Sequence, residues 1–234
     1  YKFPFPIILQ IIEGLENSTR LKNNGIRFEH EGKRPLGKWL EHPNDYQGFE
    51  DDKYGTAFQT TYIPDLGLFF VVIDLDSHDE EKDIPMDELM DAIPEEFINT
   101  RIINTPTNGK HLFYLSQKPI KRKDSGNINI DYKTIRKHNV EKTSDGYKTN
   151  GKGGYVVSTF RWSFDGTSKE EYIWDENSNK DILIVENVDD VLSQIYTNLH
   201  ERGLVSDEDF RNVMELDYGE NVESIVDDIA IISK

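Results

Sequence analysis

The fold is decided by the stretch Leu66-Gly67-Leu68-Phe69-Phe70-Val71-Val72-Ile73-Asp74-Leu75-Asp76. Its run of apolar, aromatic and β-branched residues predicts a buried central strand over 66–73. Side chains alternate along a strand, so Asp74 and Asp76 should point to one face with Cα atoms roughly 6.5 Å apart. Two such carboxylates repel each other unless a cation neutralises them, which favours a metal site. The alternative is that both residues open a solvated loop, because Ser77-His78-Asp79-Glu80-Glu81 follows.

Length and composition indicate a globular protein with one main domain. The 234 residues suffice for a sizeable core, and we expect a domain over 1–184 and a helical segment or linker over 185–234. The absence of Cys excludes disulfides, Cys-ligated zinc and thiol catalysis, and suits a reducing cytoplasm. The longest apolar run is too short to span a bilayer, so we expect a cytoplasmic protein without membrane contact. The chain begins without Met, which suggests a fragment of a longer protein.

The charge of the chain is strongly acidic but unevenly distributed. A net charge of −17 argues against a protein coated in nucleic acid. Between residues 118 and 152, however, ten Lys or Arg stand against four Asp or Glu. A locally basic segment beside an acidic site suits an enzyme that follows a nucleic-acid strand, although a solvated basic loop would have the same composition. The candidate template-binding residues are Lys121, Arg122, Lys123, Lys133, Arg136 and Lys137.

Periodicity and turn signals predict an α+β fold with a mixed or antiparallel sheet, because hairpins dominate and strands precede the terminal helices. Asn108-Gly109 lies between two β-rich runs and predicts a hairpin. Residues 33–56 and 133–153 are rich in Gly, Pro or polar residues and predict loops, the second one mobile. The expected strands are 25–30, 66–73, 100–104, 111–116, 127–132, 154–158 and 170–174, and the expected helices are 6–16, 86–92, 188–204, 207–216 and 222–232.

The predicted hairpin turn, Thr105-Pro106-Thr107-Asn108-Gly109-Lys110-His111, is a candidate phosphate-binding element. A turn that exposes backbone N–H groups at Thr107, Asn108 and Gly109 can hold a triphosphate. Lys110 would add a compact positive charge, and His111 can donate a hydrogen bond from either ring nitrogen. The alternative is an ordinary hairpin with a packed or surface His.

A third carboxylate ends another predicted strand, Asn127-Ile128-Asn129-Ile130-Asp131. On a neighbouring strand, Asp131 would complete the coordination of two divalent ions, because Mg²⁺ prefers oxygen ligands. Two such ions held about 3.5–4 Å apart serve in-line phosphoryl transfer. The alternative is an Asp that caps a turn at the end of the strand.

In their order along residues 20–160, these elements resemble the Prim-Pol family of the archaeo-eukaryotic primase superfamily. The resemblance implies an RRM-like primase-polymerase core with a small N-terminal α/β part. It also implies that Asp74, Asp76 and Asp131 bind two Mg²⁺ or Mn²⁺ ions, and that Lys110 and His111 contact the phosphates of a dNTP or NTP. The matching elements are Lys33-Arg34-Pro35-Leu36-Gly37-Lys38-Trp39, Ile73-Asp74-Leu75-Asp76, Thr105 to Tyr114, Ile130-Asp131 and Gly153-Gly154-Tyr155-Val156-Val157.

The chain departs from the family pattern at three points. Gly109 stands where family members often have Ser, two residues before the His. About twenty residues separate Asp131 from Gly153-Gly154-Tyr155, so either residues 133–152 are an insertion or Asp145 is the third ligand; we favour Asp131 for its strand context. No Cys is present to form the zinc-binding element of some relatives.

The expected function is therefore a DNA primase/polymerase of plasmid or virus replication. It would synthesise and extend primers on single-stranded DNA by two-metal nucleotidyl transfer. Tyr132, Tyr147 or Tyr155 could stack on template bases, but the favoured alternative is that each of them is a core or structural residue. A helicase domain C-terminal to this region is the expected partner. The alternatives are a metal-dependent nuclease, which needs no triphosphate pocket, and a non-catalytic replication or origin-binding module.

Overall fold

The computed structural model describes part of the chain: residues 25–29, 34–35, 54–76, 84–122, 128–135, 139–149, 154–157, 160–162, 170–179 and 181–215. The helices expected at 6–16 and 222–232 lie outside the described residues, as do Lys33 and 36–39 of the first family element.

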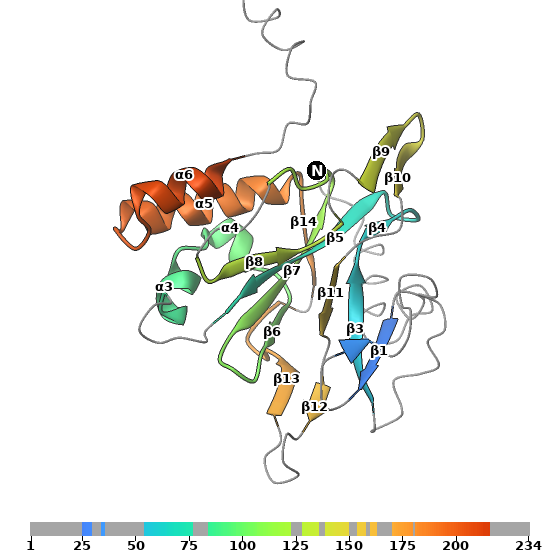
Figure 1. Ribbon diagram of the computed structural model, residues 1–234, viewed down its shortest axis with the longest axis horizontal. Coiled ribbons are helices and arrows are strands. Elements are labelled where there is room, and N and C mark those ends of the chain that lie inside the picture. The colour runs from blue at the N-terminus through green and yellow to red at the C-terminus, as the bar shows by residue number, and fades with distance from the viewer. Residues whose placement is uncertain are drawn as a thin grey trace, which may run out of the picture.

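A large mixed sheet forms the centre of the described structure (Figure 1). Its middle strand β5 (Leu68–Leu75) pairs antiparallel with β7 (Lys110–Ser116) along its length, and on its other side with β4 (Tyr62–Ile63) and then β8 (Ile130–Lys133). The predicted hairpin is confirmed, since β6 (Ile102–Asn104) pairs antiparallel with β7. The sheet is completed by β13 (Glu170–Trp174), β12 (Phe160–Trp162) and β14 (Leu183–Val185), and β14 is parallel to β7.

Two smaller sheets accompany the central one. The first has the antiparallel order β11 (Gly154–Val157), β3 (Tyr54–Thr60), β1 (Gly25–Glu29), β2 (Arg34–Pro35). The second is the hairpin of β9 (Val140–Thr143) and β10 (Gly146–Thr149), which the loop predicted over 133–153 did not include. Aromatic contacts of one residue anchor this hairpin, because the Tyr147 ring lies 5.0 Å from that of Phe69 and 5.7 Å from that of Tyr62. A single aromatic residue is too small a signal to emerge from a polar composition.

Four described helices lie on one side of the central sheet, and the sheet of β3 and β11 lies on the other (Figure 1). The helices α3 (Met86–Asp91), α5 (Val188–Glu201) and α6 (Asp207–Met214) confirm the predictions at 86–92, 188–204 and 207–216. The four-residue α4 (Glu95–Ile98) was not predicted. The longer helices begin at side-chain caps: Asn187 accepts from the Asp189 N–H, and Ser206 accepts from the Asp209 N–H. None of the helices described is long and apolar enough to cross a membrane.

The strand β5 is buried on both faces and divides the core in two. Phe69, Val71, Ile73 and Leu75 pack with α3, α5 and α6, whereas the alternate residues pack with β3 and β11. The helix α5 packs on the core, because its apolar residues lie in the same cluster as Phe69, Val71, Ile73 and Leu75. Asp74 follows the alternation of Leu68, Phe70 and Val72, which places it on the face away from the helices.

Candidate acidic site on the central sheet

Three predicted site residues form a row across three neighbouring strands. Asp74 on β5 lies opposite Asp131 on β8 and opposite His111 on β7. Residues that lie directly opposite in antiparallel strands point to the same face, with Cβ atoms about 4.5–5.5 Å apart. The His111 Nε2 lies 3.2 Å from the Asp74 Oδ1. The structure therefore brings Asp131, Asp74 and His111 together.

Lys133 adds a positive charge to this row. It lies two residues after Asp131 on β8 and therefore on the same face. Its Nζ contacts the Asp131 carboxylate and lies 3.7 Å from the Asp74 Oδ2. Burial by itself would lower the pKa of Lys133, but the hydrogen bond to Asp131 and the charges of Asp131, Asp74 and Asp76 raise this pKa above its ordinary value. Lys133 was expected at the template; the structure places it among the carboxylates.

Asp76 is held just beyond the end of β5 by a neighbouring side chain. Its backbone N–H donates to the Asn129 carbonyl at 3.0 Å, and the Asn129 side-chain amide donates to the Asp76 carbonyl at 2.7 Å. The same amide donates to the Ile84 carbonyl and accepts from the Ile84 N–H, each at 3.0 Å. Sequence reasoning gave Asn129 no role, although a polar residue two positions before Asp131 on a strand was a usable signal.

The turn before β7 packs directly against the chain at Asp76. A Cβ at Gly109 would lie 2.6 Å from the Leu75 carbonyl oxygen and 3.7 Å from the Asp76 Cα. The turn closes through the Thr105 N–H, which donates to the Gly109 carbonyl at 2.9 Å, and Asn108 has a φ of 61°. Gly at position 109, where the family often has Ser, is thus explained by this close approach. Thr107 and Asn108 are exposed beside the acidic row.

Lys110 does not join His111 at the site, contrary to the prediction that both contact phosphate. Adjacent residues on a strand point to opposite faces, and Lys110 lies opposite Leu75 instead of Asp74. Its Nζ donates to the Asn104 Oδ1 at 2.6 Å and to the Asp175 Oδ2 at 3.2 Å. Burial alone would raise the pKa of Asp175, but hydrogen bonds from the Asn177 N–H and Lys110 lower this pKa below its usual range. Lys110 therefore ties β6, β7 and the end of β13 together.

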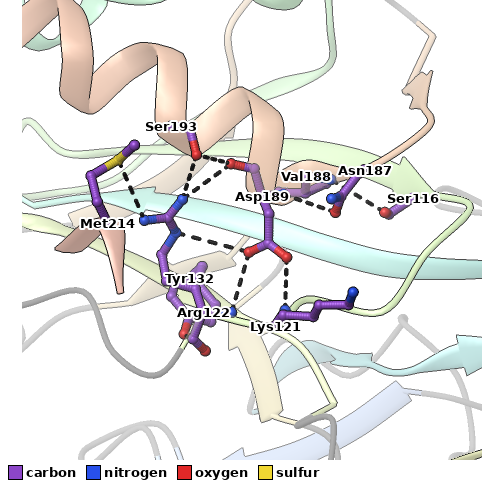
Figure 2. Close-up of polar contacts among 9 residues, drawn as sticks. All are labelled: Ser116, Lys121, Arg122, Tyr132, Asn187, Val188, Asp189, Ser193 and Met214. Carbon is purple, nitrogen blue, oxygen red and sulfur yellow. Dashed lines mark hydrogen bonds and ion pairs between the residues drawn. The ribbon is translucent and has the colours of Figure 1, made fainter. Parts of the chain in front are cut away.

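Arg122 is not available to a template either, because its side chain is fully buried. Figure 2 shows its guanidinium among residues of α5 and Met214. One Nη donates to the Asp189 carbonyl at 3.1 Å and to the Ser193 Oγ at 2.7 Å. The backbone N–H of Lys121 donates to the Asp189 carboxylate at 2.7 Å, so this stretch is held against α5. The other proposed template contacts, Lys123, Arg136 and Lys137, lie outside the described residues.

Asp145, the alternative third ligand, lies in the exposed turn of the β9–β10 hairpin. The neighbouring Gly146 lies against Tyr62, because a Cβ there would be 2.8 Å from the Tyr62 hydroxyl. Tyr62 pairs with Phe69 near the start of β5, five residues or about 17 Å of strand before Asp74. The structure therefore places Asp131, and not Asp145, beside Asp74.

The surroundings of the row come from β13 and β11, two strands that the sequence predicted at 170–174 and 154–158. His111 is 5 % exposed, and its ring centroid lies 5.8 Å from that of Tyr172 on β13. The His111 Nδ1 has no hydrogen-bond partner among the described residues. Gly154 at the start of β11 lies close to β8, since a Cβ there would be 3.7 Å from the Lys133 Cβ and 3.1 Å from the Thr60 Oγ1. Gly154 of the Gly-Gly-Tyr element thus lies beside the base of the Lys133 side chain.

The chemistry of these donors fits the expected ions, although their present arrangement does not form a ready binding site. Asp74, Asp76 and Asp131 supply carboxylate oxygens, which Mg²⁺ and Mn²⁺ prefer. Within the described part of the chain, however, no three Asp, Glu, His or Cys side chains have the spacing to hold an ion. Lys133 contacts two of the three carboxylates from between them.

Comparison with models of known protein families gives no match for this chain, and comparison with curated proteins gives none either. The functional conclusion below therefore depends on the residues and their geometry.

Proposed function

We propose that this chain is the catalytic region of a DNA primase/polymerase that transfers nucleotides to a growing strand on a single-stranded template. The observation that carries the proposal is the row of Asp131, Asp74 and His111 across three strands, with Asp76 at the end of β5. The order of the motifs along the chain, together with the mixed α+β sheet, supports an RRM-like core of the Prim-Pol kind.

The carboxylates of Asp74, Asp76 and Asp131 would hold two Mg²⁺ or Mn²⁺ ions. When bound, such ions lower the pKa of an attacking 3′-hydroxyl and neutralise the charge that develops on the leaving pyrophosphate. The His111 Nε2 lies 3.2 Å from the Asp74 Oδ1, so the ring would help to position this carboxylate. Being buried on the inner side of the row, it acts mainly as a positioning residue.

The phosphates of the incoming nucleotide would lie near the turn over 105–109. This turn packs on the backbone beside Asp76 and exposes Thr107 and Asn108. Since Lys110 is bound to Asn104 and Asp175 on the other face, the role expected of it falls to Lys133, whose ammonium lies within the row. In the reaction, the 3′-oxygen would lose its proton to water and bond to the α-phosphorus, while the bond from the α-phosphorus to the oxygen that bridges to the β-phosphate breaks and pyrophosphate leaves.

The test is synthesis from labelled dNTPs or NTPs on unprimed and primed single-stranded DNA, with Mg²⁺ or Mn²⁺. Wild-type protein should make product. The rate of synthesis by Asp74→Asn or Asp76→Asn should fall about a hundredfold or more, because the charge of the transition state is no longer neutralised. Asp91→Asn is the matched control, since Asp91 is exposed at the end of α3, on the helix side of the sheet.

Product on unprimed DNA would identify a primase, and product on primed DNA alone a polymerase. Degradation of the DNA by wild-type protein but not by Asp74→Asn would instead identify a nuclease. If wild-type protein neither makes product nor binds nucleotide with Mn²⁺, the proposal is wrong.

A further inference from the structure

Lys133 has an unusual position for a lysine on a partly exposed strand. Its ammonium lies between the carboxylates of Asp131 and Asp74, and the charge of Asp76 also acts on it. The neighbouring carboxylates of Asp131, Asp74 and Asp76 would repel one another strongly without a counter-charge, so this ammonium does locally what a bound cation would do. His111 also lies within ion-pair distance of Asp74.

The position of Lys133 follows from the fold and not from chance contact of a flexible side chain. The register of β8 on β5 places Lys133 opposite Val72, on the face of Asp74. Gly154 of β11 lies beside the base of the Lys133 side chain, since a Cβ at Gly154 would be 3.7 Å from the Lys133 Cβ. The side chain is nevertheless 33 % exposed, so its ammonium can leave the row without unfolding the strand.

We propose that Lys133 is a built-in competitor for the divalent ions: it neutralises Asp74 and Asp131 when no ion is bound and must leave them for an ion to bind. This inference rests on the metal-binding part of the proposed function. A divalent ion bound by Asp74 and Asp131 would lie close to this ammonium, and the repulsion between the two positive charges disfavours their joint presence. Lys133 thereby keeps the row stable without an ion and weakens its affinity for ions.

The experiment measures Mn²⁺ binding alone, by calorimetry and by the relaxation of water protons, with no nucleotide, template or turnover. Lys133→Met should bind Mn²⁺ about tenfold or more tightly than wild-type protein, because the competing charge is gone. Without ions it should melt at a lower temperature than wild-type protein, and saturating Mn²⁺ should restore most of this loss. Lys142→Met is the matched control, because Lys142 is exposed on the β9–β10 hairpin; it should change neither quantity.

Lys133→Arg retains the charge and should retain weak Mn²⁺ binding. If Lys133→Met does not fold without ions, Lys133→Gln is measured instead, and folding that depends on Mn²⁺ supports the proposal. Mn²⁺ affinity that is unchanged or weakened in both neutral variants overturns it. If the wild-type protein and the variants bind Mn²⁺ as proposed but none makes product, the polymerase activity is refuted. The competition between Lys133 and the ion would then still hold. If neither wild-type protein nor any variant binds Mn²⁺, both proposals fail together at their shared metal site.

Discussion

The backbone at the end of β5 leaves no room for a side chain at position 109. A Cβ there would lie 2.6 Å from the Leu75 carbonyl oxygen and 2.7 Å from the Thr105 Oγ1. The first of these atoms belongs to a buried strand and cannot turn away as a flexible side chain could. Because Gly109 has no Cβ, the turn over 105–109 can lie against Asp76. The predicted phosphate-binding turn and the predicted metal ligand are therefore close together.

We predict that Gly109→Ser destabilises the protein by about 1–3 kcal/mol, because the turn must move away from β5. Chemical denaturation measures the free energy of unfolding. Asn108→Gly is the control: Gly relieves the positive φ of Asn108 but gains freedom in the unfolded chain, so its effect should stay below about 1 kcal/mol. Equal stability of Gly109→Ser and wild-type protein would show that the turn adapts at no cost.

At the scale of elements, a buried ion pair connects the helices to the strand that carries Asp131. The Arg122 side chain is held by Asp189 and Ser193 of α5, while its own carbonyl accepts from the Tyr132 hydroxyl at 2.7 Å (Figure 2). Tyr132 lies between Asp131 and Lys133 on β8. Burial lowers the pKa of Arg122, and the charge of Asp189 partly offsets this shift. Burial also raises the pKa of Asp189, and the charge of Arg122 partly offsets that shift. The segment preceding β8 is thereby fixed against α5.

Removing one member of this pair should leave a buried charge without its partner. We predict that Arg122→Met and Asp189→Asn each lower the free energy of unfolding by about 3–5 kcal/mol. In the double variant no unpaired charge remains. Its loss of free energy of unfolding should therefore be smaller than the sum of the losses in the two single variants by at least about 1 kcal/mol. Denaturation of all four proteins gives this coupling. Strictly additive losses would mean that Arg122 and Asp189 act independently.

Element by element, the predictions succeeded where the local pattern was strong. The apolar run over 66–73 predicted a strand, and β5 lies there. The apolar spacing over 188–204 predicted a helix, and α5 lies there. The β9–β10 hairpin was missed because its sequence is polar and its anchor is the distant Phe69. The separation of Lys110 from His111 was available from strand alternation alone, yet the reasoning from the turn had given both residues the same phosphate role.

At the scale of the whole molecule, the charge of −17 opposes compaction. The described ion pairs at the surface, such as Lys118 with Glu186, offset little of this, because exposed pairs contribute at most about 1 kcal/mol each. Acidic self-repulsion is therefore a general property of this chain.

We predict that the melting temperature rises when NaCl increases from about 10 mM to about 150 mM, because the Debye length falls from about 30 Å to about 8 Å and the repulsion is screened. Differential scanning calorimetry measures this shift. Glycerol at the same osmolarity serves as the uncharged control. A melting temperature that falls with salt would show that attractive ion pairs outweigh the repulsion.

The sequence by itself determined the central strand, the main helices and the position of Asp74 near the end of β5, because these depend on contacts between residues close in the chain or on a pattern repeated over many residues. Only the tertiary structure decided that Asp131 and not Asp145 lies beside Asp74, that Arg122 is buried, and that Lys133 contacts the carboxylates. These depend on the register between strands more than fifty residues apart in the chain and on the packing of α5. Such register is set by long-range packing, which no local pattern of residues specifies.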